Sequence, residues 1–92
     1  MQICEVIGNV TSTVKNDHFI GKKIMIVQPL DLDGNAEGKD YLALDTVDAG
    51  KGDRVLVMKE GGSAQIVLQD KEIPVQALIL GIIDDVEIAD SK

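Results

Sequence analysis

Short runs of hydrophobic residues, separated by clusters of polar residues and glycines, set the pattern of this chain. The runs are rich in valine and isoleucine, whose branched side chains favour the pleated surface of a sheet. The first run alternates apolar and polar positions, as a strand with one buried face does. The pattern predicts strands at residues 2–14, 23–28, 41–47, 54–59 and 75–83.

The polar segments between these runs predict turns and loops at residues 15–22, 31–40 and 48–53. In the last of these, Gly50 and Gly52 can supply the positive φ angles that a tight turn needs. Ser63 is a predicted N-cap, which indicates one short helix at residues 64–68. A polar loop containing Pro74 then leads into the last strand.

Five strands and one short helix are typical of a small five-stranded OB-like barrel. A β-sandwich is the alternative, although it usually needs more strands. A chain of 92 residues has room for one hydrophobic core and predicts a single domain over residues 1–92.

Several predicted strands are apolar on both faces, whereas a solitary antiparallel sheet needs only one apolar face and a small barrel has one interior. The outward set on the last strand is either Ala77, Ile79 and Ile83 or Leu78, Leu80 and Ile82. Each such side chain left in water forgoes about 1.5–3 kcal/mol of burial, and a contiguous patch marks an interface. We therefore predict self-association, with Ile79 and Ile82 as interface candidates; the alternative is that the helix and the long loop cover these faces.

Charge and composition exclude several partners. The net charge is −7 and aromatic residues are 2% of the chain, so the chain lacks the basic groove and stacking rings of an oligonucleotide-binding barrel. An OB-type module for a peptide or oligonucleotide remains the alternative function. We expect no membrane partner, because no apolar run reaches about 20 residues and no signal-peptide pattern opens the sequence. A single cysteine fits a reducing cytoplasm.

Candidate chemistry is weak. The acids of residues 31–37 mimic a calcium loop, but the sixth and twelfth positions hold Ala36 and Leu42 in place of glycine and glutamate. Cys4 lies on an apolar strand face and His18 in a polar loop, and neither has a third group to orient a nucleophile. We expect no catalytic residue, cofactor or metal, and therefore no enzyme.

Eight segments resemble the EutN/CcmL family, the vertex proteins of carboxysomes and metabolic microcompartments, in their order and spacing. They span nearly the whole chain. These segments are residues 6–10, 12–15, 21–24, 27–31, 43–53, 55–57, 62–64 and 79–84.

The resemblance implies an OB-like barrel assembled as a ring of five. Such a ring caps the vertices of a bacterial microcompartment shell whose facets are tiled by hexameric shell proteins, so the implied role is structural. It also implies a narrow pore on the ring axis, with Gly61, Gly62 and Ser63 as candidates for the axis-facing loop. The implied turn or interface positions are Thr13, Lys15, Asp45, Gly50 and Gly52.

The chain departs from the family pattern at three positions. Asp48 stands where the family often has glycine, so the turn is expected to differ in shape. Gln65 and Gln76 stand where arginine and aspartate are common. If those charges join subunits in relatives, this chain must replace them.

Overall fold

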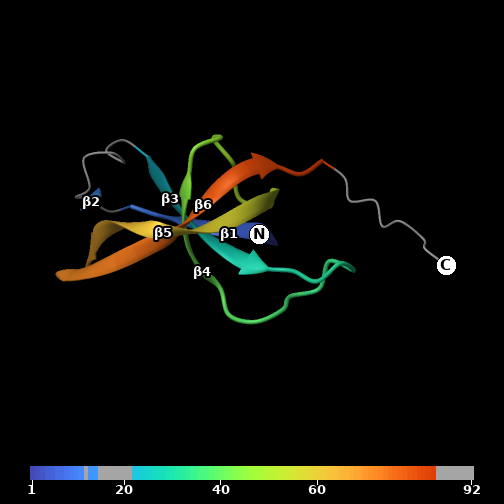
Figure 1. Ribbon diagram of the computed structural model, residues 1–92, viewed down its shortest axis with the longest axis horizontal. Helices are drawn as coiled ribbons and strands as arrows, with labels where there is room; N and C mark the ends of the chain where they lie inside the picture. Colours follow the sequence, from blue (N-terminus) through green and yellow to red (C-terminus); the bar gives the residue numbers. More distant parts are fainter. Residues whose placement is uncertain (12, 15–21, 85–92) are drawn as a thin grey trace.

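The computed structural model describes residues 1–11, 13–14 and 22–84, apart from the side chains of residues 13–14 and 60–63. These residues form six strands and no helix (Figure 1). The strands are β1 (Gln2–Val10), β2 (Thr13–Val14), β3 (Lys23–Pro29), β4 (Tyr41–Asp45), β5 (Arg54–Leu68) and β6 (Lys71–Ile82). The prediction of an all-β fold is confirmed.

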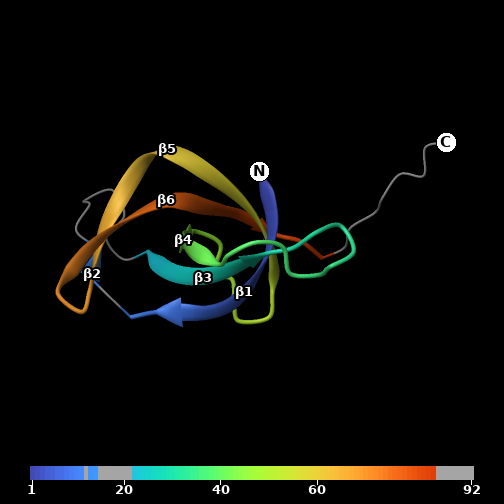
Figure 2. The same ribbon diagram turned by 90° about the horizontal axis from the view of Figure 1, so that it is seen from below.

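The strand pairing closes into a ring. β1 pairs antiparallel with both β3 and β5, β3 pairs with β4, and β5 pairs with β6. A short parallel contact between β4 and β6 completes the circuit, and β2 adds to the outer part of β5. Figure 2 shows β5 and β6 arching together above β1 and β3.

Two hydrophobic clusters form on opposite faces of β3 and β4, because neighbouring residues of a strand point to opposite sides. Met25 belongs to the cluster that includes Val27 and Ile79, whereas Ile24 belongs to a second cluster. In that second cluster, Ile66 and Val75 from the far half of the β5–β6 hairpin pack with Ile24. The expectation of one interior was therefore wrong: the chain folds its own hairpin over part of the outward apolar surface.

The short helix predicted at residues 64–68 is wrong. This segment is the end of β5, and it pairs with β6 from Ala64 with Val75 to Leu68 with Lys71. Ala64 and Ile66 are buried while Gln65 between them is partly exposed, which is the period-two pattern of a strand. A cross-strand partner and β-branched side chains outweigh the weak N-cap signal of Ser63.

The hairpin turns at Gln69 and Asp70, both of which have positive φ angles of 50° and 66°. Two successive positive φ angles match the twist of antiparallel strands in a two-residue connection. Pro74, predicted in a loop, lies within β6 and pairs with Gln65. Residues 71–75 of β6 pair with β5 alone, so their other side is an open strand edge, and an open edge tolerates a residue without a backbone N–H.

Candidate functional site

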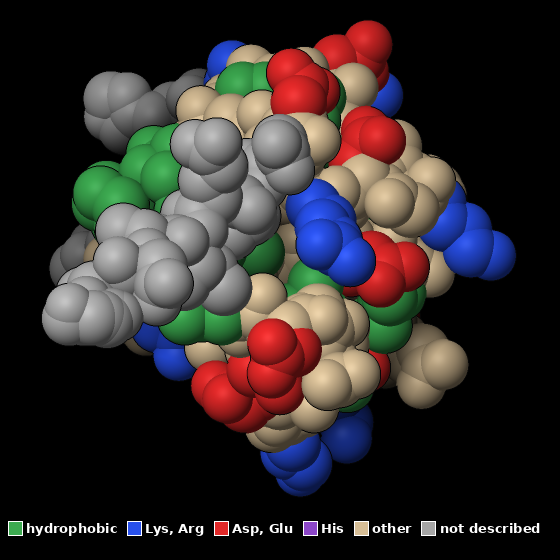
Figure 3. Space-filling view, turned by 90° about the vertical axis from the view of Figure 1, so that its right-hand side faces the viewer, with side chains coloured by type: hydrophobic (Ala, Val, Ile, Leu, Met, Phe, Trp, Pro, Cys, Tyr) green, Lys and Arg blue, Asp and Glu red, His purple; other side chains and the backbone are tan. Residues whose placement is uncertain are grey.

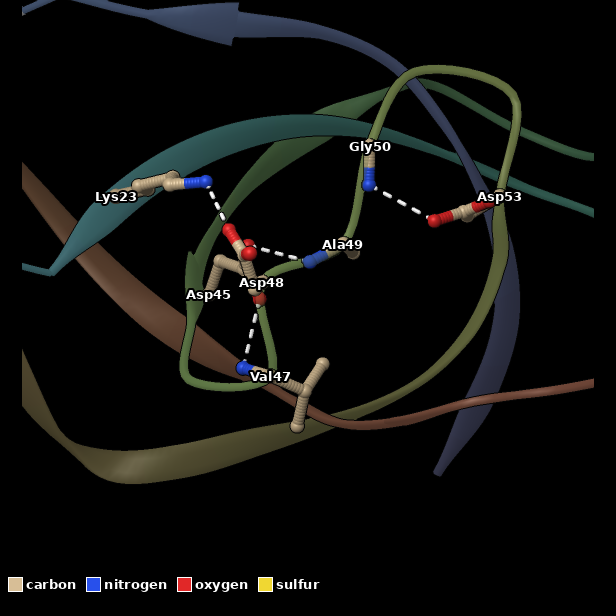
Figure 4. A network of polar contacts seen from close by, with 7 residues as sticks. All are labelled: Lys23, Asp45, Val47, Asp48, Ala49, Gly50 and Asp53. Atoms are coloured by element: carbon tan, nitrogen blue, oxygen red, sulfur yellow. Dashed lines mark hydrogen bonds and ion pairs between the residues drawn. The ribbon is translucent and has the colours of Figure 1, made fainter.

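The connection between β4 and β5 is built around one buried carboxylate (Figure 4). Asp45 is 4% exposed, and its two oxygens accept hydrogen bonds from the backbone N–H groups of Val47 at 2.9 Å and Ala49 at 2.8 Å. Ala49 is itself buried in the ring core. The carboxylate therefore bends the chain inward and satisfies two backbone donors there, which gives predicted residue Asp45 a turn role.

The second half of the connection is fixed against β1. Gly50 donates its N–H to the Asp53 carboxylate at 2.8 Å, and Gly52 donates to the Val6 carbonyl at 2.7 Å. Gly52 has a φ of 94°, as its predicted turn role requires, while Gly50 is not among the residues of positive φ. Asp48 has the other positive φ in this connection, at 61°.

Asp48 also forms an exposed ion pair with Lys23 of β3 (Figure 4). The hydrogen bond and the charge attraction lower the pKa of Asp48 and raise the pKa of Lys23. Because folding lowers the pKa of Asp48, its carboxylate stabilises the fold at pH values above the pKa of the unfolded chain, and this contribution is lost as the pH falls through the pKa of the folded state. Because folding raises the pKa of Lys23, its ammonium stabilises the fold at pH values below the pKa of the unfolded chain, and this contribution is lost as the pH rises through the pKa of the folded state. The pair is intact at neutral pH, and because it is solvated its contribution is small and weakened by salt.

Replacing Asp48 separates backbone strain from the ion pair. Asp48→Gly and Asp48→Ala both remove the pair, but only alanine retains a Cβ in the left-handed region. We expect Asp48→Ala to melt a few degrees below Asp48→Gly in thermal denaturation at neutral pH. Equal melting temperatures for the two variants would show that the positive φ carries no strain.

Partly exposed apolar side chains gather where β1, β5 and β6 adjoin. Leu56 of β5 pairs with Ile3 on one side and with Gly81 on the other, and Ile82, the last residue of β6, pairs with Val55. Leu80 is 37% exposed and Ile82 is 44% exposed. We call this surface the outer apolar patch and define it as Ile3, Leu56, Met58, Leu80 and Ile82.

The two interface candidates of the last strand lie in different places. Ile79 is wholly buried in the ring core with Ala77, which points to a core role, and its assignment to the interface stays a prediction. Ile82 lies at the surface, within the outer apolar patch. Of the two outward sets considered, Leu80 and Ile82 are the exposed members, whereas Leu78 packs against the second cluster.

A groove opens where β4 and β6 diverge. The two strands pair only at Leu44 with Leu78 and at Asp45 with Ile79. Beyond these pairs a depression of about 310 Å³ separates them. It is lined by Tyr41, Leu42, Lys59, Ile73, Pro74, Gln76 and Ala77.

A polar cluster borders this groove. The Lys59 ammonium lies 5.0 Å from the centre of the Tyr41 ring, a cation–π arrangement. The Tyr41 hydroxyl donates to Gln2 Oε1 at 2.9 Å and lies 3.4 Å from the Cys4 Sγ. Burial raises the pKa of the Cys4 thiol and of the Tyr41 phenol, so both are protonated at neutral pH. A protonated, buried thiol is a poor nucleophile.

The remaining predicted positions are dispersed. Thr13 lies in β2 and pairs with Val67, whereas Lys15 and His18 lie outside the described residues. Gly61, Gly62 and Ser63 lie within β5, where the pairing with β6 shifts register between Lys59 and Ala64. The axis-facing role of these three residues stays a prediction.

Hydrogen bonds to the Asp31 carboxylate order the acidic segment of residues 31–37. Asp31 accepts hydrogen bonds on Oδ1 from the N–H groups of Asp33 and Asn35, both at 2.9 Å. Within the described part of the chain, no three acidic, histidine or cysteine side chains are grouped as metal ligands would be.

Figure 3 shows acidic and basic side chains interspersed on the face that is turned to the viewer. Among the residues described here, no helix has the length and apolarity to span a membrane.

Sequence reasoning missed two features of these surfaces. The Lys23–Asp48 ion pair joins residues 25 positions apart, and no sequence pattern signals that contact. The groove depends on where β4 and β6 separate. In the sequence, Pro74 was the signal that could have indicated this groove, since a proline within a strand marks a stretch with one unpaired edge.

Comparison with known proteins identifies relatives over nearly the whole chain. The family model described as ethanolamine utilisation protein EutN/carboxysome matches residues 1–84. The carboxysome shell vertex protein CcmL of Thermosynechococcus vestitus is 38% identical over 86 residues, covering 94% of this chain and 86% of the relative. The microcompartment shell vertex protein EutN of Salmonella typhimurium is 31% identical over the same shares of each chain.

Solved structures show the same likeness. The GrpN pentameric microcompartment shell protein from Rhodospirillum rubrum superposes with a TM-score of 0.75 at 31% identity. The alignment covers 98% of this chain and all of that protein. The structure of CcmL from Gloeobacter violaceus gives a TM-score of 0.73 at 30% identity, with 96% and 90% coverage.

Proposed function

This chain belongs to the EutN/CcmL family, and from that premise we propose that it is a structural shell protein, not an enzyme, that forms pentameric vertices of a bacterial microcompartment. The observation that carries the proposal is the likeness over nearly the full chain to proteins named as shell vertex components, one of them a pentamer. We also propose that residues 1–92 form one domain. The closed ring of strands supports describing that domain as an OB-like barrel.

The physical basis of the role is geometric. A flat layer of six-fold units cannot close into a polyhedron unless five-fold units introduce curvature. A cyclic ring of identical chains closes on itself through one repeated head-to-tail contact. We propose that hexameric shell proteins surround this ring and that it resides in the shell of the compartment.

The outer apolar patch gives the ring a driving force. Leu80 and Ile82 are large aliphatic side chains that a free subunit leaves partly in water. Covering each one contributes up to about 1.5–3 kcal/mol, reduced by the fraction already buried. A small subunit with marginal stability of its own gains from such burial.

We expect native mass spectrometry and sedimentation at micromolar concentration to show a discrete ring of five chains. Ile82→Asp places a charge in the patch, so it should shift this ring toward monomers while the monomer keeps its β-sheet circular dichroism. As a control, Leu32→Asp places the same charge on a side chain that is 64% exposed and lies outside the patch, and it should leave the ring intact. A monomeric wild type would refute the proposed function.

A further inference from the structure

A head-to-tail ring requires two different surfaces on every subunit, because each chain contacts one neighbour with one surface and the other neighbour with another. The outer apolar patch is one such surface. Resting on the proposed function, we propose that the groove between β4 and β6 is the second surface, and that it receives Leu80 and Ile82 of the next copy.

The shape of the groove is set by the backbone. β4 begins at Tyr41 and β6 at Lys71, yet they pair only at Leu44 with Leu78 and at Asp45 with Ile79. Before that point β4 pairs with β3 alone and β6 with β5 alone, so two strand edges face the depression. Strand edges that face solvent are sites where another chain docks.

The lining of the groove suits aliphatic side chains. Leu42, Ile73, Pro74 and Ala77 contribute apolar surface on its two walls. Leu42 and Ile73 are only half-buried, so they retain surface that a neighbour can cover. A depression of about 310 Å³ has room for more than one branched side chain. The patch and the groove are thus matched in polarity, and each leaves apolar surface in water in the free subunit.

Charge fixes the direction in which the two surfaces meet. Among the described side chains that line the groove, Lys59 is the only charged one, and it is exposed. The outer apolar patch ends at Ile82, and the exposed carboxylate of Asp84 follows two residues later. Docking Ile82 of the next copy in the groove brings its Asp84 toward Lys59. Opposite charges at the edge of an apolar contact select its register and orientation.

A charge-swap series tests this contact. Lys59→Glu should raise the concentration at which the ring dissociates by roughly tenfold or more, because the groove would then meet Asp84 of the next copy with a like charge. Lys59→Gln should weaken the ring less, since it removes attraction without adding repulsion. Combining Lys59→Glu with Asp84→Lys should restore assembly. Native mass spectrometry over a dilution series at low salt measures all three.

Two controls make the result specific. Lys22→Glu carries the same charge reversal. Lys22 lies next to Lys23, which pairs with Asp45 at one end of the β3–β4 ladder, whereas Tyr41 of the groove pairs with Val27 at the other end. It should assemble like the wild type. Circular dichroism and thermal melting of each variant confirm that the subunit folds, since Lys59 and Asp84 are both exposed.

The outcomes separate this inference from the proposed function. A wild-type monomer refutes both. A wild-type ring that Lys59→Glu leaves unchanged, or that Asp84→Lys fails to rescue, overturns the groove as the docking surface while the pentamer stands. Loss of the ring in Lys59→Glu, with recovery in the double variant and no loss in Lys22→Glu, establishes the contact.

Discussion

Ile79→Asp is expected to abolish the cooperative unfolding transition of this protein. Ile79 is 0% exposed and lies in the ring core, opposite Val57 of β5. The substitution loses the burial of one aliphatic side chain, about 1.5–3 kcal/mol, and leaves a carboxylate without a partner in an apolar interior. The unpaired charge adds several kcal/mol, and the sum approaches the whole stability of about 5–15 kcal/mol that a small domain has.

Thermal and urea denaturation followed by circular dichroism measure this effect. Ile79→Val removes one methyl group at the same site and should cost only about 0.5–1.5 kcal/mol. Ile82→Asp introduces the same charge three residues later, on a side chain that is 44% exposed, and should leave the monomer folded. A well-folded Ile79→Asp subunit that fails to assemble would instead place Ile79 at the subunit interface.

Asp45→Ala is expected to destabilise the fold by about 3 kcal/mol. The buried carboxylate satisfies the N–H groups of Val47 and Ala49, and alanine offers them no acceptor. A hydrogen bond to a charged group contributes about 1.5–3 kcal/mol, and a buried donor left unpaired costs about 1–3 kcal/mol. In a domain of this size the loss corresponds to roughly 12–24 °C in melting temperature.

Two comparisons isolate the role of this carboxylate. Asp45→Asn keeps one acceptor oxygen and should lose roughly half as much stability. Asp40→Ala removes an exposed acid from the preceding loop and should change stability by less than about 0.5 kcal/mol. All variants are compared at one protein concentration, because ring formation shifts the apparent stability. A melting temperature for Asp45→Ala equal to that of Asp40→Ala would contradict the assigned role.

The strands were predictable where the hydrophobic runs were long and bounded by turn residues. β3 begins at Lys23 and β4 at Tyr41, as predicted, and residues 48–53 form the expected connection. Asp45 was found through the family resemblance, and the structure explains it by two hydrogen bonds. The strand predicted over residues 2–14 is instead divided, because β1 ends at Val10 and β2 begins at Thr13.

The segment of residues 64–68 shows why other predictions were wrong. A segment of five residues with four apolar members fits one turn of helix and one strand equally well, and its neighbours in sequence do not decide between them. The decision came from β6, which supplies a partner for every residue from Ala64 to Leu68. Propensity is a weak preference, and a cross-strand partner for each residue overrides it.

By itself the sequence determined that this chain is built from strands with an aliphatic core, that its net charge is −7, and that it resembles the shell vertex proteins. It could not determine which face of residues 77–83 is the interior, because both faces are apolar and a period of two fits either choice equally. Only the closure of β4 onto β6 decided that Ile79 is buried in the ring core while Leu80 and Ile82 stay exposed. That decision depends on which distant strands meet, and a contact between distant strands is a property of the whole fold.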